Sequence, residues 1–124
     1  GLVMGTRAGD LDPGIVLRLA REALARAAAA DGPPGDPLAS LDELLNRRSG
    51  LLALAGTSDM EEVERGARAG EPRATLALEV YVQRLRRYLG AMCASLGGAD
   101  AIAFSGGIGE HAALVRARAC GGLG

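Results

Sequence analysis

The feature that most constrains this chain is a long apolar stripe in its second half. Its members alternate spacings of four and three: Leu78, Val82, Leu85, Leu89, Met92 and Leu96. This period predicts one α-helix from Arg73 to about Leu96, roughly 36 Å long. Three further apolar residues lie off the stripe: Leu76, Val80 and Tyr81. We therefore expect a central core helix, buried on more than one side, rather than a free coiled coil.

A first helix is predicted after an N-terminal loop dense in glycine and aspartate. Asp12 can cap free backbone N–H groups, and Pro13 suits the first helical position. The helical period then continues to about Ala30. The stretch Asp31–Pro37 contains three prolines and two glycines, and we interpret it as an exposed connector.

Two more helices are predicted from capping residues. One begins after Ser40, with Glu43 completing a capping box, and runs to Arg48. The next follows the polar turn Thr57-Ser58-Asp59, with Ser58 or Asp59 as its cap. On the residues alone, this turn is interpreted as a helix cap.

The one α/β unit predicted lies near the C-terminus. The apolar run Ala101–Phe104 suits a buried strand, Ser105–Glu110 forms a glycine-rich turn, and a helix follows from about His111 to Ala119. Glycines let a backbone approach an anion closely, and a helix start offers free N–H groups. The loop also fits the dinucleotide fingerprint G-x-G-x-x-A at Gly107–Ala112. A tight turn that binds nothing stays an equal alternative.

Composition excludes several function classes. All 14 basic residues are Arg, which rules out a lysine-type phosphate loop or a Schiff base within this chain. The net charge of −1 gives no electrostatic footprint for nucleic acid or an acidic membrane. No signal segment or 18-residue apolar run is present, so a cytoplasmic protein is expected. Cys93 and Cys120 are interpreted as buried free thiols, and the single histidine leaves no metal site.

Arg7 is the candidate catalytic residue of the N-terminal loop. A guanidinium can make paired, charge-assisted hydrogen bonds to a phosphoryl group in transfer. On the bare sequence, however, a simple ion pair between Arg7 and Asp10 or Asp12 is the more common outcome. The loop alone does not decide between these two interpretations.

Four segments read in order resemble the acetate kinases and their propionate- and butyrate-kinase relatives. Gly1–Gly14 resembles the family signature, and Leu45–Leu52 is similar to its LN-x-x-SGL stretch. Thr57–Met60 is similar to its SSDMR turn, and Phe104–Glu110 to its FTGGIGEN loop. The segments span nearly the whole chain, and the first and last are highly specific.

The resemblance implies reversible, ATP-dependent phosphorylation of acetate to acetyl phosphate with Mg²⁺. It implies a helix-rich part of the C-terminal domain of an α/β, actin-like and sugar-kinase-like ATPase fold, in a homodimer. By this resemblance Arg7 stabilises the transition state. The implied ATP contacts fall on two segments: Asp59, Met60 and Glu61, and then Gly107, Ile108, Gly109, Glu110 and His111.

The chain departs from the family at two of these positions. The family usually has Arg where this chain has Glu61, and Asn where it has His111. The first change puts an anion near the expected nucleotide, unless Arg65 or Arg68 substitutes for the missing cation. A non-catalytic interaction or dimerisation module is therefore kept as the alternative function.

Residues 1–124 are interpreted as a piece of a domain, incomplete at both ends. The sequence opens on Gly1 without an initiator methionine and closes directly after a helical pattern. The family's metal-binding residues, catalytic aspartate, histidines and late glutamate have no counterpart in it. We therefore expect the chain alone to have no kinase activity, with the metal ligands supplied from outside it.

Overall fold

The structure, a computed structural model, describes residues 1–30 and 35–122. The helices within these ranges are α1 (Pro13–Ala29), α2 (Pro37–Arg47), α3 (Gly50–Ala55), α4 (Met60–Arg68), α5 (Pro72–Leu96), α6 (Gly106–His111) and α7 (Ala113–Cys120). The predicted helix-rich character is confirmed. The connector predicted over residues 31–37 lies partly outside the described residues.

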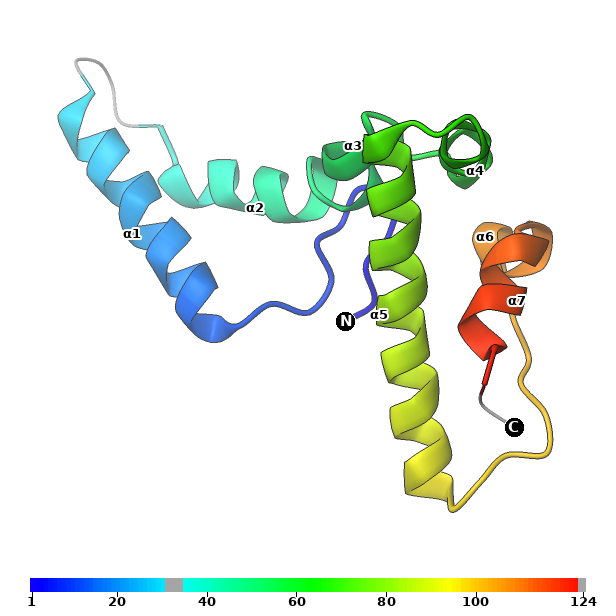
Figure 1. The fold of residues 1–124 in the computed structure, drawn as a ribbon. Coiled ribbons are helices and arrows are strands. Elements are labelled where there is room, and N and C mark those ends of the chain that lie inside the picture. The colour runs from blue at the N-terminus through cyan, green and yellow to red at the C-terminus, as the bar shows by residue number, and fades with distance from the viewer. Residues whose placement is uncertain (31–34, 123–124) are drawn as a thin grey trace.

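Helix α5 is the centre of the fold, as its apolar stripe predicts. Helices α3, α4 and α7 all pack against it (Figure 1). The core that they form also includes one residue of the N-terminal segment; its members are Val3, Leu51, Met60, Val63, Ala77, Leu78, Tyr81, Val82, Ala112 and Val115. Burial of this apolar surface is the main stabilising contribution to the assembly.

Only the first half of α5 is a core helix. Leu78 and Val82 are buried and Leu85 packs against the core. Farther along the same stripe, Met92 is 59% exposed and Leu96 is 76% exposed. The prediction of a helix buried on several sides is therefore right for its N-terminal half and wrong for its last turns, where Met92 and Leu96 are exposed.

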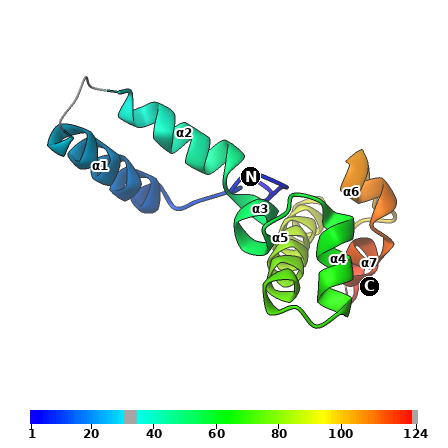
Figure 2. The same cartoon turned by 90° about the horizontal axis from the view of Figure 1, so that it is seen from above.

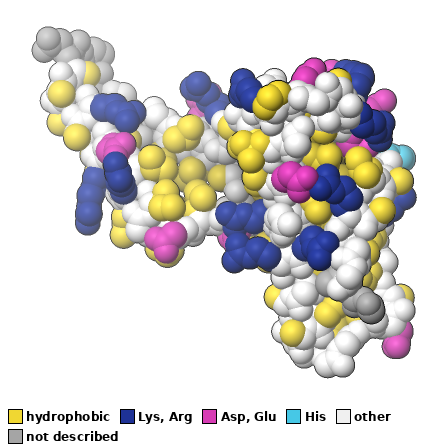
Figure 3. All heavy atoms as spheres, in the orientation of Figure 1, with side chains coloured by type: hydrophobic (Ala, Val, Ile, Leu, Met, Phe, Trp, Pro, Cys, Tyr) yellow, Lys and Arg dark blue, Asp and Glu magenta, His cyan; other side chains and the backbone are white. Residues whose placement is uncertain are grey.

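Helices α1 and α2 form a hairpin that projects from the rest of the molecule (Figures 1 and 2). They contact each other, and neither contains a buried residue. Several of their apolar side chains are exposed: Ile15, Leu17, Leu24, Leu38 and Leu44. Hydrophobic side chains are visible along the projecting hairpin in Figure 3. The hairpin thus adds little to the core on α5.

The starts of the helices show which of the predicted capping residues the structure uses. Asp12 caps α1 by accepting a hydrogen bond from the Gly14 N–H, and Asp59 caps α4, both as predicted. The second helix, however, begins at Pro37 and not after Ser40. Asp36 caps it, because an aspartate followed by proline satisfies a free N–H and presets the first helical φ angle. The Ser40 capping box is thus a wrong prediction.

The predicted strand at Ala101–Phe104 is not formed, and the described residues contain no β-strand. A strand needs a neighbour for its backbone hydrogen bonds, and none of the described residues forms a β-bridge with this segment. The glycine-rich turn is also different from the prediction, since Gly106–His111 is itself a short helix followed by α7. The dinucleotide interpretation loses the strand that its fingerprint requires.

Cys93 and Cys120 are free thiols, as predicted, although both are partly exposed rather than buried. In the described ranges, no helix combines the length and apolar character needed to cross a membrane.

Candidate functional site

The loop that carries Arg7 is held against the α2–α3 junction by backbone hydrogen bonds. The N–H groups of Ser49, Leu51 and Leu52 donate to carbonyl oxygens of the loop, at 2.8 to 3.0 Å. In return, the Ala8 N–H donates to the Leu45 carbonyl oxygen at 3.0 Å. The loop is thus paired along its length with the segment that contains the Ser-Gly-Leu motif.

Gly50 is required at this junction for two reasons. Its φ angle of +62° lies in the left-handed region, which L-residues with a Cβ rarely adopt. A Cβ at this position would also collide with the Met4 carbonyl oxygen and lie 2.8 Å from the Arg7 carbonyl oxygen. The close approach of the loop therefore depends on the absence of a side chain at Gly50.

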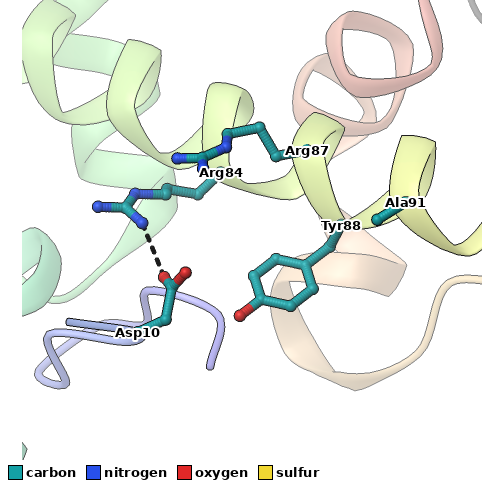
Figure 4. A pocket seen from close by; sticks show the side chains of 5 residues that line it. All are labelled: Asp10, Arg84, Arg87, Tyr88 and Ala91. Carbon is teal, nitrogen blue, oxygen red and sulfur yellow. Dashed lines mark hydrogen bonds and ion pairs between the residues drawn. The ribbon is translucent and has the colours of Figure 1, made fainter. Parts of the chain in front are cut away.

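The side chain of Arg7 is exposed and is not paired with the nearby carboxylates. Asp10 instead accepts a hydrogen bond from Arg84 of α5 at 2.7 Å (Figure 4). Asp12 accepts one from the Gly14 N–H at 2.7 Å as the cap of α1. Within the described chain, the Arg7 guanidinium has no ion pair or hydrogen bond. The interpretation of Arg7 as a local ion-pair partner is therefore wrong.

The ion pair of Asp10 with Arg84 lies at the edge of a hollow of about 380 Å³ between the loop and α5. Arg87, Tyr88 and Ala91 complete its lining (Figure 4). This ion pair fastens the C-terminal end of the Arg7 loop to the central helix. The rest of the loop is held by its backbone hydrogen bonds to the α2–α3 junction.

The start of α4 is fixed by its cap and by the core. The Asp59 carboxylate accepts a hydrogen bond from the Glu61 N–H at 2.8 Å, and the Asp59 N–H donates to the Thr57 hydroxyl at 3.2 Å. Met60 is only 4% exposed and belongs to the core. The backbone of this turn is therefore rigidly placed, while the Glu61 side chain stays exposed.

The glycine loop folds back on itself. Gly106 has a φ angle of +77°, and its N–H donates to the Glu110 carboxylate at 3.0 Å. Arg116 of α7 donates to the carbonyl oxygens of Gly109 and Glu110 at 2.9 and 2.7 Å. Glu110 therefore closes the loop, and Arg116 satisfies the C-terminal carbonyl groups of α6.

The turn at α4 and the glycine loop line one hollow of about 620 Å³, a volume usual for small-molecule sites. Its lining residues are Ser58, Asp59, Met60, Glu61, Glu64, Arg68, Gly107, Ile108, His111 and Ala112. Six of the eight residues expected to contact a nucleotide are among them. Gly109 and Glu110 are not.

Four lining residues were not among the expected nucleotide contacts: Ser58, Glu64, Arg68 and Ala112. Arg68 was considered only as a substitute cation, and a helical signal could have placed both Arg68 and Glu64 at the site. Met60, Glu64 and Arg68 are spaced by four residues, so they occupy one face of α4. Ala112 directly follows His111, and Ser58 directly precedes Asp59.

Arg7 lines a different hollow, of about 350 Å³, with Met4, Gly9, Leu45 and Asn46 among its neighbours. Its loop nevertheless reaches the start of the α4 turn. A Cβ at Gly5 would lie 3.0 Å from the Ser58 carbonyl oxygen, so the backbones are in close contact there. The structure thus brings the Arg7 loop against the same turn that lines the larger hollow.

The larger hollow is richer in carboxylates than in cations. Asp59, Glu61 and Glu64 line it, against the single guanidinium of Arg68. Arg65, the other substitute considered for the missing cation, lies outside it and pairs with Glu62 at 3.7 Å. In the described ranges, no three His, Cys, Asp or Glu side chains are grouped to hold a metal ion.

Comparison with known proteins agrees with this arrangement. The sequence pattern of the Acetokinase family matches residues 1–124. The chain belongs to the acetokinase family. It is 49% identical to the acetate kinase of Leifsonia xyli subsp. xyli over 124 residues, which cover 100% of this chain and 28% of that protein. It is 42% identical to the acetate kinase of Syntrophobacter fumaroxidans, over 99% of this chain and 27% of that protein.

Solved structures of acetokinase-family enzymes share the fold. A Porphyromonas gingivalis acetate kinase matches with a TM-score of 0.79 and 38% identity, over 98% of this chain and 28% of that one. A propionate kinase from Francisella tularensis subsp. tularensis matches with a TM-score of 0.79 and 33% identity, over 99% and 29% of the two chains. The chain thus spans under a third of the length of these relatives.

All four segments that resemble acetokinase motifs meet in the structure. The signature loop lies on the Ser-Gly-Leu junction, and its Gly5 contacts the turn before α4. That turn then shares a hollow with the glycine loop. The signature loop and the glycine loop, about 90 residues apart in the chain, therefore both lie near the turn before α4.

Proposed function

We propose that this chain is part of the C-terminal domain of an acetate kinase that reversibly phosphorylates acetate to acetyl phosphate with ATP. One observation carries the proposal. The two segments expected to bind ATP line a single hollow, and the loop of the expected catalytic arginine lies against the same turn.

The chemistry required is positioning and charge stabilisation. A carboxylate oxygen of acetate forms a bond to the γ-phosphorus of ATP, and the bond from that phosphorus to its bridging oxygen breaks, so that ADP leaves. Negative charge spreads over the oxygens of the transferring group in the transition state. The Arg7 guanidinium is permanently charged and has a planar fork that matches those oxygens. Because Asp10 and Asp12 have other partners, this charge is available for a ligand.

The proposal extends to the metal, the location and the oligomeric state of the longer protein that carries this chain. Magnesium would accompany ATP. The described residues contain no group of three His, Cys, Asp or Glu side chains that could hold the ion, so we assign no part of the phosphoryl transfer in this chain to it. The acetokinase relatives lead us to expect a cytoplasmic homodimer. The 124-residue chain by itself is expected to lack activity.

The test of the proposal is Arg7→Ala in the protein that carries this chain. We expect kcat for acetyl phosphate formation to fall by about 10³ to 10⁵, while the Kd for ATP changes little. Arg21→Ala is the matched control, since Arg21 is an exposed arginine of the projecting hairpin. A loss of less than about tenfold for Arg7→Ala would remove the catalytic role of this residue.

The alternative of an interaction module has one observation in its favour. The hairpin and the second half of α5 expose apolar side chains, which are common at protein–protein contacts. ATP binding separates the two functions. A wild-type protein that carries this chain and gives no binding signal with ATP would favour the interaction module.

A further inference from the structure

One face of α5 contacts the N-terminal segment through two side chains. Arg84 donates a hydrogen bond to the Asp10 carboxylate at 2.7 Å. Tyr88 lies four residues later on the same face of the helix, and a Cβ at Gly1 would collide with its hydroxyl. Figure 4 shows both side chains directed from α5 toward the segment that carries Asp10. The central helix is thus in direct contact with this segment.

The position of Arg84 is fixed by the core. Its neighbour Leu85 packs against the core, and the two residues before Gln83, Tyr81 and Val82, are buried. The side chains of Arg84 and Asp10 are 33% and 47% exposed, and an ion pair at such a surface adds little to the free energy of unfolding. The effect to expect from this pair is therefore on the local position of its partner rather than on overall stability.

Asp10 lies where the Arg7 loop leaves the packed part of the molecule. Backbone hydrogen bonds to the α2–α3 junction hold the loop as far as Ala8. Two residues after Asp10 comes the cap of α1, and the hairpin of α1 and α2 has no buried residue. Among the described residues, the hydrogen bonds of Asp10 with Arg84 and with the Gly1 carbonyl oxygen are the last before this hairpin that hold the loop on the packed part.

The placement of the Arg7 side chain depends on the backbone of this loop. Arg7 precedes Asp10 by three residues, and its guanidinium has no ion pair or hydrogen bond in the described chain to fix it. A displacement of about 1 Å at a catalytic group can lower a rate by about 10²-fold. An anchor that keeps the loop still therefore has a direct consequence for the expected chemistry of Arg7.

We infer that Arg84 is a positioning residue for phosphoryl transfer, which acts through Asp10 to hold the Arg7 loop in place. This inference rests on the proposed function, because it takes Arg7 as the residue that contacts the transferring phosphoryl group. Arg84 has no contact with the substrates in this role. It lines the hollow beside α5, and not the larger hollow formed by the α4 turn and the glycine loop.

The experiment is steady-state kinetics of acetyl phosphate formation, together with ATP titration calorimetry, on the protein that carries this chain. In Arg84→Ala we expect kcat to fall by about ten- to a hundredfold, because the loop loses its anchor on α5. The Kd for ATP should stay within about twofold of the wild-type value, since Arg84 lies outside the hollow expected to bind ATP.

Arg87→Ala is the matched control. Arg87 lies three residues farther along α5, lines the same hollow and forms no ion pair in the described chain. Its removal takes away the same charge without breaking the anchor, so kcat should stay within about twofold of the wild type. Arg84→Lys keeps one charged donor for Asp10, and kcat should recover to within about fivefold of the wild type.

Two double variants distinguish a positioning role from a general structural one. Asp10→Ala breaks the same ion pair from the loop side, so Arg84→Ala combined with it should have a kcat within about threefold of the lower single variant. In an Arg7→Ala background, Arg84→Ala should lower kcat further by less than about twofold, because the group that it positions is already absent. Asp10→Ala is the test variant if Arg84→Ala does not fold.

The outcomes separate this inference from the proposed function. A kcat in Arg84→Ala within about twofold of that in Arg87→Ala would overturn the inference. An equal loss from Arg84→Ala with and without Arg7 would also overturn it, since a purely structural role acts in both backgrounds. Neither result affects the proposed function as long as Arg7→Ala loses activity as expected. If the wild type forms no acetyl phosphate, the proposed function fails, and this inference fails with it.

Discussion

Arginine side chains satisfy helix-end carbonyl groups in this chain, which contains no lysine. Arg73 donates to the carbonyl oxygens of Ala53 and Leu54 at the end of α3, at 3.0 and 2.9 Å. Arg116 does the same for Gly109 and Glu110 at the end of α6. A planar fork with several donors can serve two carbonyl groups at once. Arg7, which has no such partner in the described chain, differs from these structural arginines.

Glu61 is the site residue whose charge opposes the proposed ligand. We expect Glu61→Arg to tighten ATP binding by about three- to tenfold. The substitution replaces the repulsion between the Glu61 carboxylate and the ATP phosphates by an attraction between a guanidinium and the phosphates, and solvent screens both. The gain should shrink when the salt concentration rises from about 0.02 M to about 0.5 M. Titration calorimetry at the two salt concentrations measures it. Glu62→Arg, one residue farther along α4 and outside the hollow, is the control; an equal gain there would mean that only net charge matters.

Ionisation of Tyr81 should lower the stability of the core at alkaline pH. Burial raises the pKa of the Tyr81 hydroxyl above its ordinary value of 10.0. As the pH rises past about 10, the unfolded chain loses this proton first, so the free energy of unfolding should fall by at most about 1.4 kcal/mol per pH unit. Below that pH the stability is fully present.

Urea unfolding at about pH 8 and about pH 11 tests this in the wild type and in Tyr81→Phe. The phenylalanine variant should lose less stability over this interval, because its ring has no proton to release. Tyr88→Phe is the matched control, since Tyr88 lies outside the core on the same helix. An equal alkaline loss in the wild type and in Tyr81→Phe would contradict the assignment.

At the scale of elements, the junction of α2 and α3 decides where the Arg7 loop lies. Gly50→Ala should destabilise the protein by about 3 kcal/mol or more, because it adds a steric clash with the loop to the strain of a positive φ angle. Activity should fall with it, as the loop is displaced. Urea unfolding and steady-state kinetics measure the two effects.

Gly56→Ala separates the two causes. Gly56 also has a positive φ angle, +86°, but a Cβ there would meet nothing within 4 Å. We expect it to cost only about 1 kcal/mol and to leave kcat unchanged. Equal losses in the two variants would show that backbone strain alone, and not the docking of the loop, matters at Gly50.

At the scale of the whole molecule, the chain has a packed part around α5 and a projecting hairpin. Helices α1 and α2 contain no buried residue, whereas α4 and the first half of α5 supply much of the core. In the 124-residue chain we therefore expect amides of α1 to exchange with solvent within about tenfold of the unprotected rate. Amides of α4 and of residues 74–82 should be protected more than about a thousandfold.

Hydrogen exchange followed by mass spectrometry measures this difference peptide by peptide. The last turns of α5, where Met92 and Leu96 are exposed, provide an internal control and should resemble the hairpin. Equal protection in α1 and in the first half of α5 would contradict the division. It would mean that the hairpin has a packing partner, such as a second copy of the chain.

The sequence by itself determined the features that depend on neighbours along the chain. Asp12 and Pro13 start a helix through local capping, and a regular apolar stripe makes α5 the centre of the fold. The order of four motifs was enough to indicate the family. Prediction from neighbouring residues failed where two capping signals competed. The second helix starts at the Asp36–Pro37 pair and not after Ser40.

Only the tertiary structure decided which distant residues meet. It paired Asp10 with Arg84, 74 residues away, and so left Arg7 without its nearest carboxylate. It set Glu64 in the same hollow as the glycine loop, and among the described residues it left Ala101–Phe104 without a neighbouring strand. Pairing and burial depend on contacts between remote segments, and the local pattern of a chain does not contain them.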